Sequence, residues 1–596
     1  MPHAFERPLR AGVIERTAMN RRHFLAASAA LAVTAPRSLH ASAIPAAASS
    51  SVSTLPAFAR YQLTLERVLS GPNPAYTSSF LLEDLRGTPG SRRFTNFSGD
   101  LSGRWIGALT SSAAAFGQSF PALQSFVRAA LPLQHPEGYF GTTFNADQPT
   151  DDDLALLWGN GRLLVGLLEY NSHYPDPAAL AAARRLGDFL VSIGSLFNSS
   201  AMADAFSAAH FASSYICWTQ QTEGLAALYA ETHDSRYRDL CAEIASRMER
   251  RPGDHVHGYL CSVRGVLDLY NATGDIAHLI RVIAAWNDIE QSGDVLITGG
   301  VPEAWSPKRK RTEGCAECDW LRLNLALHRA TGEEKYLEVA ETAAFNEFAM
   351  NQFATGDFGH GTLDAAGIPT TVAVRAWWCC TLHGLRAFSD LHTHVFRIRE
   401  NEIFYDLPLD GLLRAGTIEA DSHSTLAADG KVSIVLRRAA ATQSLTVRQP
   451  AWATAVRLRH NGLPVTGLRI PVLRSGDTVT AKYEMARRTK TVPAAESLPA
   501  RTAIFVGPWL LGASSHDQPG YFNELHIDNR LLAGSLHAVS TRNASPFAVP
   551  IAASACTFTP AEYPEQPGYV QLRAVAEQTA CDPARWMTAF LTRSTS

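Results

Sequence analysis

The sequence has little excess charge of either sign and few cysteines. Its 596 residues carry 53 Lys and Arg against 56 Asp and Glu, a formal net charge of −3. Without a basic surplus, no bulk electrostatic attraction to nucleic acid or to an anionic membrane is expected. The nine cysteines are an odd number, which argues against a complete disulfide framework. The totals therefore disfavour a nucleic-acid-binding protein and a disulfide-rich module.

Long apolar runs are also scarce, and the one near the N-terminus has the form of an export signal. Arg21 and Arg22 lie in a twin-arginine motif, an Ala-rich apolar run follows them, and Ala41-Ser42-Ala43 offers a small-residue cleavage site. The run is too short to remain in a bilayer as a spanning helix. We therefore expect a twin-arginine signal peptide over 1–43, a flexible leader over 44–54, no stable membrane insertion, and a periplasmic or secreted protein.

Apolar residues, in contrast, are plentiful at 46%, which is enough for large buried cores. Over residues 55–397 their spacing is helical. The segments 228–234, 269–275 and 327–333 repeat one pattern, in which a helix ends in a short turn and an acidic residue starts the next helix. Such a pattern is typical of a helical-hairpin repeat. Closed into a ring, these hairpins would form an (α/α) toroid, and an open solenoid is the alternative.

After residue 397 the apolar period changes to two, as in strands. Alternating apolar residues are Val432, Ile434, Leu436, Val479, Ala481, Tyr483 and Met485. Asn461-Gly462 is a strong signal for a hairpin turn. We expect a β-sandwich domain over 398–500 and a second β-rich segment over 501–596. Helices first and strands second indicate separate domains.

Two pairs of cysteines carry the most informative chemistry. Cys315 and Cys318 follow Glu313 closely, and Cys379 and Cys380 are adjacent later in the chain. Thiolates together with a carboxylate form tetrahedral zinc sites, with bonds of about 2.0–2.3 Å. Three arrangements stay open on spacing alone: four cysteine ligands; Glu313 with Cys315, Cys379 and Cys380, leaving Cys318 as a small buried residue; or a vicinal disulfide between Cys379 and Cys380.

These motifs resemble glycoside hydrolase family 127, the β-L-arabinofuranosidases, over nearly all of the predicted mature chain. The Glu-x-Cys and Cys-Cys combination is the most specific mark of the resemblance. Residues 96–104, 158–164, 255–260 and 445–453 are also similar to family motifs. The resemblance implies an (α/α)₆ barrel as the catalytic domain, followed by β-sandwich domains, and a retaining glycosidase mechanism.

The resemblance also implies roles for individual residues. Glu313, Cys315, Cys379 and Cys380 match the family's Zn²⁺ ligands, and Cys379 also matches its nucleophile. Glu303 matches the acid/base. A thiol attacks well only as a thiolate, which metal coordination favours. An acid/base group works best when its pKa lies near the working pH.

Substrate contacts are expected from neighbouring side chains. His255 and His257 lie in a stretch similar to the family's sugar-contacting region, with helix capping or core hydrogen bonding as the alternative. Trp305 and Trp378 are candidates for stacking on the sugar, with core packing as the alternative. Asn160 stands where relatives often have histidine, so the sugar could differ from L-arabinofuranose. Weaker candidates are His210, His360 and His383.

The sequence thus predicts an exported, exo-acting, β-L-arabinofuranosidase-like enzyme that uses Zn²⁺ and takes a glycoside or oligosaccharide substrate. Two other functions compete with this one. The first is a non-catalytic carbohydrate-binding toroid with a structural zinc ion. The second is a toroid glycosidase that uses carboxylates only, such as a uronyl hydrolase. The basic run Lys308–Arg311 is interpreted as a solvated loop.

Overall fold

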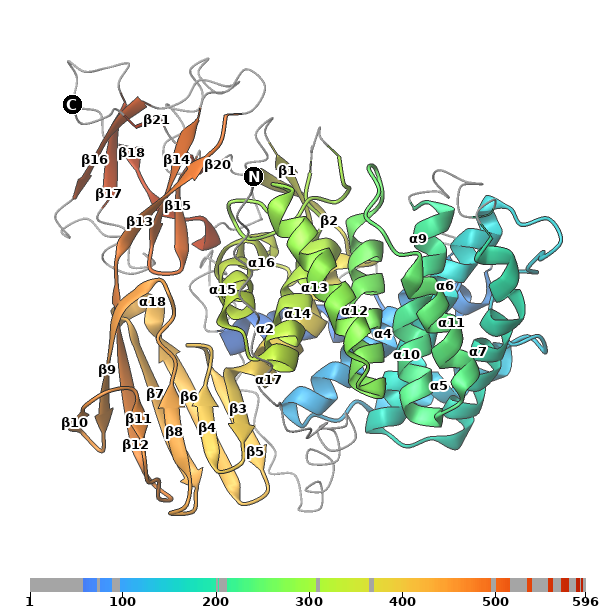
Figure 1. Ribbon diagram of the computed structural model, residues 1–596, viewed down its shortest axis with the longest axis horizontal. Coiled ribbons are helices and arrows are strands. Elements are labelled where there is room, and N and C mark those ends of the chain that lie inside the picture. Colours follow the sequence, from blue (N-terminus) through green and yellow to red (C-terminus); the bar gives the residue numbers. More distant parts are fainter. Residues whose placement is uncertain are drawn as a thin grey trace, which may run out of the picture.

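The computed structural model describes residues 57–71, 75–87, 97–199, 202, 212–306, 311–363, 369–494, 500–514, 533–538, 556–560, 570–577, 586–589 and 591–592. Helices come first along the chain and strands last (Figure 1). The predicted signal peptide, the leader, His210 and residues 308–310 of the basic run lie outside the described residues. Within the described part, every helix is too short or too polar to cross a membrane.

Six of the described helices form a closed ring. They are α4 (Asp100–Phe116), α6 (Asp151–His173), α10 (Gln221–Thr232), α12 (Val256–Thr273), α14 (Gly314–Thr331) and α17 (Cys380–Val395). Each contacts the next, and α17 contacts α4. This closure confirms the predicted toroid and excludes the open solenoid.

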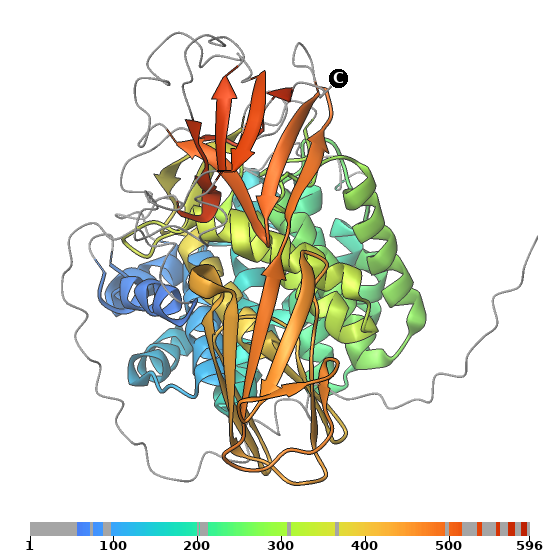
Figure 2. The same cartoon turned by 90° about the vertical axis from the view of Figure 1, so that its left-hand side faces the viewer.

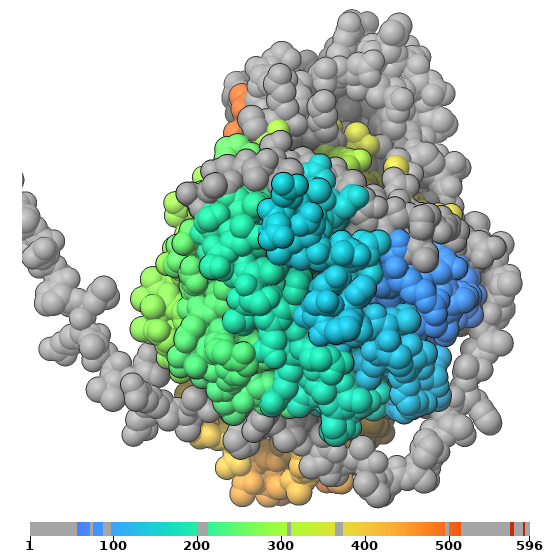
Figure 3. Space-filling view, turned by 90° about the vertical axis from the view of Figure 1, so that its right-hand side faces the viewer, coloured from blue at the N-terminus to red at the C-terminus, as the bar shows by residue number. Residues whose placement is uncertain are grey.

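Further helices cover the outside of the ring. They are α2 (Ala57–Ser70), α3 (Ser78–Arg86), α5 (Pro121–Ala130), η2 (Leu131–Leu133), α7 (Pro177–Phe197), α11 (Ser235–Ser246), α13 (Ile276–Gln291) and α15 (Glu334–Thr342). The short helix α9 (Ser214–Thr219) leads into α10 and contacts α6 and α12. α7 packs on α6 and α10, α11 on α10 and α12, α13 on α12, and α15 on α14. Figure 3 shows the side of the molecule turned away from most of the strands, where blue to green helical segments make up most of the coloured surface.

Three inner helices end in the same kind of turn, as the repeated pattern predicted. α10, α12 and α14 are each followed by one left-handed residue, His233 (φ 57°), Gly274 (φ 72°) and Gly332 (φ 74°). An acidic residue then starts the outer helix that returns the chain. Because each hairpin brings the chain back, the inner helices run in one direction and their N-termini meet at one end of the ring. We call this end the mouth.

Irregular chain builds part of the mouth. The loop between α13 and α14 is held by isolated β-bridges, Pro302 to Thr312 and His255 to Ala304. A third bridge joins Arg311 to a hairpin of β1 (Gly359–Leu363) and β2 (Pro369–Arg375), which the helical pattern had not predicted. The hairpin follows a π-helical turn, η3 (Ala343–Glu347), and α16 (Phe348–Asn351).

Two sheets beside the barrel form the predicted sandwich (Figures 1 and 2). One has the order β10-β9-β12-β7-β6-β5, and the other has the order β11-β8-β4-β3, with β4 and β8 parallel. Their elements are β3 (Phe396–Arg399), β4 (Glu402–Tyr405), β5 (Gly411–Ala415), β6 (Ile418–Thr425), α18 (Leu426–Asp429), β7 (Lys431–Arg438), β8 (Ser444–Val447), β9 (Ala453–His460), β10 (Leu463–Val465), β11 (Arg469–Ile470) and β12 (Thr478–Met485). The alternating residues Val432, Ile434 and Leu436 are fully buried, because one face of β7 packs in the core.

Further strands follow the sandwich. They are β13 (Arg487–Val492), β14 (Arg501–Val506), β15 (Trp509–Ser514), β16 (Ala533–Ala538), β17 (Cys556–Pro560), β18 (Val570–Gln571), β19 (Arg573–Ala574), β20 (Trp586–Met587) and β21 (Leu591–Thr592), with the 3₁₀ turn η5 (Val575–Glu577). They pair as β13-β14-β15-β19, with β20 on β15, and as β18-β17-β16-β21. The predicted fold class, a helical toroid followed by β-sandwich material, is confirmed. The boundaries at 397/398 and 500/501 stay predictions.

Candidate metal and catalytic site

Four of the predicted site residues lie together at the mouth. Glu313 precedes the first turn of α14, which contains Cys315, and Cys379 directly precedes α17, which begins at Cys380. One ligand atom from each of the four lies within 4.8 Å of the others, and all four residues are buried. We call Glu313, Cys315, Cys379 and Cys380 the mouth cluster. α14 and α17 are adjacent in the ring, so two helix starts bring together residues distant in sequence.

The donor set and spacing of the mouth cluster fit zinc. The Sγ of Cys380 lies 3.6 Å from that of Cys379 and 3.7 Å from that of Cys315, and the Cys379 Sγ lies 4.0 Å from the Glu313 Oε1. A tetrahedral site with Zn–S bonds of about 2.3 Å has sulfurs about 3.8 Å apart. Three thiolates and one carboxylate are also ligand types that zinc accepts.

The other two arrangements drawn from the cysteine spacing do not match the structure. Cys318 is fully buried but belongs to none of the potential metal-binding groups in the described part of the chain. Cys379 and Cys380 are free thiols, and their sulfurs are 3.6 Å apart, too far for a disulfide bond of about 2.05 Å. The structure therefore corrects both the four-cysteine alternative and the vicinal-disulfide alternative.

One sulfur of the cluster is favoured as the thiolate. Burial raises the pKa of Cys379, but hydrogen bonds from Cys315 and Cys380 and the charges of Arg104 and His360 bring that pKa well below its ordinary value. Burial raises the pKa values of Cys315 and Cys380, and the hydrogen bonds that these thiols donate to the Cys379 sulfur raise them further. The N-terminal ends of α14 and α17 also favour negative charge at this position. The chain alone thus stabilises one anionic sulfur, and a bound cation would favour more.

Predicted residue His255 contacts the mouth cluster. It directly precedes α12, and its Nε2 lies 3.0 Å from the Glu313 Oε2. Burial lowers the pKa of His255, but the Glu313 carboxylate outweighs burial, so the net shift is upward. His255 can therefore hold Glu313 in place with a charged hydrogen bond, which is the usual task of a group behind a metal ligand.

Glu303 lies in the loop between α13 and α14. Its main chain is fixed on both sides, because its N–H donates to the Arg311 carbonyl (3.1 Å) and its carbonyl accepts from Val256 N–H (2.9 Å). Its carboxylate binds the Arg311 guanidinium through two contacts, one of them 2.6 Å from Nη2 to Oε1. His360 of β1 lies 3.8 Å away, from Nδ1 to Oε1. The Glu303 carboxylate also raises the pKa of His255, the residue that contacts Glu313 of the mouth cluster.

Asn160 lies in the core, and its predicted role in sugar binding stays a prediction. Its Oδ1 accepts from Phe140 N–H (2.8 Å), and its Nδ2 lies within 3.1 Å of three carbonyls, those of Ser98, Phe140 and Leu156. The residue is fully buried within α6. Its amide therefore ties the segments before α4 and α6 to the ring and has its hydrogen bonds satisfied by backbone.

His257 and Trp305 are also buried among protein side chains, and their predicted contact with sugar stays a prediction. The His257 Nδ1 lies 2.5 Å from the Asp319 Oδ2, and burial lowers the pKa of His257 to about 3. The Trp305 ring is 2% exposed and packs between Tyr259 and the Arg250 guanidinium. Trp378, next to Cys379, is only half-buried, and its role as a stacking residue stays a prediction.

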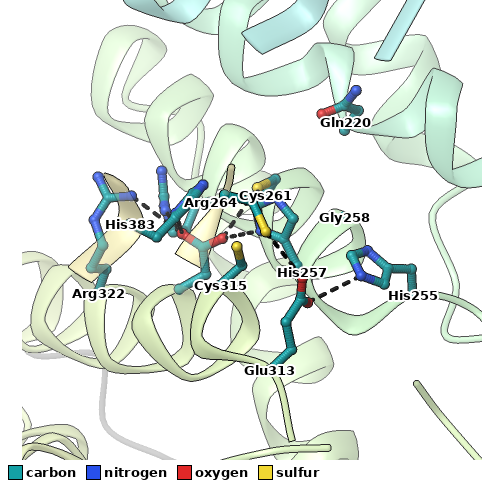
Figure 4. A network of polar contacts seen from close by, with 12 residues as sticks. Gln220, His255, His257, Gly258, Cys261, Arg264, Glu313, Cys315, Arg322 and His383 are labelled. Carbon is teal, nitrogen blue, oxygen red and sulfur yellow. Dashed lines mark hydrogen bonds and ion pairs between the residues drawn. The ribbon is translucent and has the colours of Figure 1, made fainter. Parts of the chain in front are cut away.

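Below the mouth, charged residues fill the axis of the ring. Asp319 of α14 accepts from Arg264 and His257 of α12, and Glu223 of α10 accepts from both Arg264 and Arg162. Figure 4 shows His257, Cys261 and Arg264 turned toward α14. We call Arg162, Glu223, His257, Cys261, Arg264 and Asp319 the axial network. Sequence reasoning missed it, although Arg162 inside the apolar run of α6 was a usable signal, since an unpaired arginine is rarely buried.

The axial network contains side chains of metal-binding types but does not fit a cation. His257, Cys261 and Asp319 form one such group, and His257, Cys315 and His383 form another. Arg264 forms an ion pair with Asp319, and the Arg162 Nη1 lies 3.2 Å from the Cys261 Sγ. These fixed positive charges take the place that a metal ion would need.

The comparisons with known proteins agree with this geometry. Residues 92–392 match the profile of the family described as β-L-arabinofuranosidase, GH127 catalytic domain. A solved GH127 β-arabinofuranosidase is similar over 91% of this chain and 94% of its own, with a TM-score of 0.62 and 16% identity. The GH127 β-L-arabinofuranosidase from Geobacillus stearothermophilus T6 is similar over 90% of this chain and 99% of its own, with a TM-score of 0.61 and 15% identity. No curated protein matches the sequence.

The closed helical ring, the strands and the matched profile together define a glycoside hydrolase. More particularly, the chain belongs to the GH127 β-L-arabinofuranosidase family, because the profile covers half of it.

Proposed function

We propose that this protein is a retaining, exo-acting glycoside hydrolase that removes β-L-arabinofuranose or a closely similar sugar, with Cys379 as nucleophile and Glu303 as acid/base. The observation that carries the proposal is the mouth cluster, in which Cys379 lies 3.6 Å from Cys380 and 4.0 Å from the carboxylate of Glu313. The family adds the reaction class, and the mouth of a toroid favours a pocket that takes a chain end.

The first half of the reaction would use Cys379. Its Sγ bonds to the anomeric carbon while the glycosidic C–O bond breaks and the leaving oxygen takes a proton from Glu303. The product is a thioglycoside on Cys379. In the second half, water attacks the same carbon, Glu303 takes the water proton, and the C–S bond breaks to restore the thiolate. Two displacements at one carbon retain its configuration.

Arg311 sets a condition on the acid step. In the free protein its guanidinium binds the Glu303 carboxylate, and an ion-paired carboxylate has no proton to donate. The Arg311 side chain is 57% exposed, so it is free to swing away toward solvent. We therefore expect the leaving group to displace Arg311 from Glu303 when substrate binds.

Zinc fits the chain's own donors, because the mouth cluster supplies three sulfurs and one carboxylate at tetrahedral spacing. Glu313, Cys315, Cys379 and Cys380 would hold it, with His255 behind Glu313. When bound, Zn²⁺ would keep these thiols ionised and stabilise the Cys379 sulfur as a leaving group. Export by the twin-arginine route is part of the proposal, because a thiolate site can then assemble in the reducing cytoplasm before export.

A panel of nitrophenyl glycosides that includes α- and β-L-arabinofuranosides tests the proposal. We expect hydrolysis of the β-L-arabinofuranoside with retention at the anomeric carbon, which proton NMR of the first product would show. Activity should disappear after treatment with a strong chelator and return with added zinc. A substrate stalled during turnover should add the mass of one sugar to the peptide that contains Cys379. Hydrolysis with inversion, or undiminished activity in a protein shown to be metal-free, would refute the mechanism.

A further inference from the structure

The mouth cluster carries more negative charge than one divalent cation balances. Metal binding requires its three thiols and one carboxyl to be deprotonated. Four such anions against one Zn²⁺ leave a formal excess of two negative charges in a buried site. Buried charge without a partner is costly, so a nearby cation is required. His255 supplies one candidate, at Glu313, and the second must lie on the cysteine side.

Arg104 of α4 lies on that side. Its Nη1 is 3.8 Å from the Cys315 Sγ and also contacts the Nε2 of His383. Its Nε donates to the Asp100 Oδ1 at 2.8 Å, one turn earlier on the same helix. Arg104 is only 2% exposed. Its side chain is therefore held from both ends, and one end points at a predicted metal ligand.

The partners of Arg104 are themselves fixed. Asp100 also accepts from the Trp158 Nε1 at 2.9 Å, and the Nδ1 of His383 lies 3.6 Å from the Asp319 Oδ1. Burial lowers the pKa of His383 to about 3, so His383 is neutral and can accept from Arg104. The guanidinium thus spans α4, α14 and α17 and joins the mouth cluster to the axial network.

We propose that Arg104 is a positioning residue for the metal site: held by Asp100, it keeps Cys315 in its ligand orientation and places a guanidinium beside that sulfur. The inference rests on the proposed function only in taking the mouth cluster as a zinc site. It does not depend on the sugar or on the role of Glu303. Groups behind metal ligands commonly change metal affinity 10- to 100-fold when they are replaced.

The test is zinc affinity, measured on the full chain by competition with a chromophoric chelator. Arg104→Gln combined with Asp100→Asn replaces the ion pair with two amides of similar size and removes the positive charge beside Cys315. We expect this variant to bind zinc about 10- to 100-fold more weakly than the wild-type chain. Arg104→Lys keeps the charge but cannot bond Asp100 and Cys315 together, so its affinity should fall in between.

A matched control separates this effect from the general loss of a buried ion pair. Arg448 and Glu341 form another such pair, 2.9 Å apart with side-chain exposures of 7% and 2%, and they lie outside the mouth cluster. Arg448→Gln with Glu341→Gln should lower the melting temperature but leave zinc affinity within about twofold. Reconstitution with Co²⁺ gives a second readout, because the visible bands of tetrahedral cobalt report the ligand geometry.

The inference would be overturned if the folded Arg104→Gln, Asp100→Asn variant had the zinc affinity and the cobalt bands of the wild-type chain. It would also be overturned if the wild-type chain bound no zinc. If the protein hydrolyses none of the glycosides but its zinc affinity depends on Arg104, the proposed function is refuted and the inference on Arg104 stands. Melting curves on each variant identify any chain that has not folded, and the Arg104→Lys variant then decides the question.

Discussion

The mouth cluster and the axial network are built from the same kinds of side chain, yet they differ in charge balance. Both are buried, and both bring thiols and carboxylates from α12, α14 or α17 within a few ångströms. In the axial network each carboxylate meets arginines, Glu223 with Arg162 and Arg264, and Asp319 with Arg264 and Arg322. In the mouth cluster three thiol groups and one carboxyl group face one another.

This difference separates a structural site from a chemical one. Fixed cations in the axial network lower the pKa values of Glu223 and Asp319 even against the effect of burial, so both stay ionised and neither is available to a ligand. The mouth cluster lacks that internal balance and needs a cation from outside. Replacements in the mouth cluster should therefore change catalysis, and replacements in the axial network should change stability.

The largest expected effect comes from the sulfur assigned as nucleophile. Cys379→Ser should lower kcat by about 1,000-fold or more, because a hydroxyl at this position is a far weaker nucleophile. Steady-state kinetics on the active nitrophenyl glycoside would measure it. Cys261→Ser, in the axial network, is the matched control and should keep kcat within about tenfold. Equal losses of kcat in the two variants would contradict the proposed difference between the mouth cluster and the axial network.

Replacing the acid/base should have the next largest effect. Glu303→Gln keeps the shape of the side chain but cannot transfer a proton, so kcat should fall about 100- to 10,000-fold. The loss should be smaller for substrates whose leaving group needs no proton, such as a dinitrophenyl glycoside, than for an alkyl glycoside. A loss that is independent of the leaving group would rule out Glu303 as the acid.

In the axial network the main effect should be on stability. Asp319→Asn removes one of the two buried carboxylates that pair with Arg264 and leaves only Glu223. Breaking a buried ion pair in this way typically costs about 3–5 kcal/mol of unfolding free energy. Urea unfolding would measure it. Asp390→Asn provides the comparison, since Asp390 also binds an arginine but its side chain is 37% exposed, so solvent screening should keep its loss below about 1 kcal/mol.

The last expected effect concerns the dependence of stability on pH. Burial lowers the pKa values of His257 and His383 to about 3, whereas histidine in the unfolded chain titrates near 6.5. Their stabilising contribution is therefore complete above about pH 6.5 and is lost as the pH falls toward 3, because the unfolded chain takes up protons first. Urea midpoints of the metal-free protein should fall over this range and fall less steeply in His383→Gln. A flat profile would show that the folded and unfolded chains take up protons alike, which contradicts the lowered pKa values.

Much of the helical ring was predictable because the residues that end one helix and start the next are close together in the sequence. The turns after α10, α12 and α14 repeat one short pattern, and capping preferences are set by neighbouring residues. The hairpin of β1 and β2 was missed because its short strands lie between long helical patterns. The alternation in β7 identified a half-buried strand directly from the sequence.

The candidate site was only partly predictable because its contacts are not local. Spacing could not choose between Glu313 and Cys318 as the fourth ligand, since both lie within one turn of Cys315 and only the fold decides which side chain faces α17. The core contacts of Asn160 were not predicted, because two of its backbone partners, Phe140 and Ser98, lie 20 and 62 positions away in the sequence. Arg104 belonged to a recognised motif, but its contact with Cys315 spans 211 positions.

The one-residue turns after α10, α12 and α14 place a set of exposed positions at the far end of the barrel. α14 has 18 residues, so the turn at Gly332 lies roughly 27 Å along the helix from the mouth, at 1.5 Å per residue. Glu333, directly after that turn, is exposed. A fluorophore or surface tether attached there would leave substrate access and metal exchange undisturbed, so single immobilised molecules could be watched during turnover.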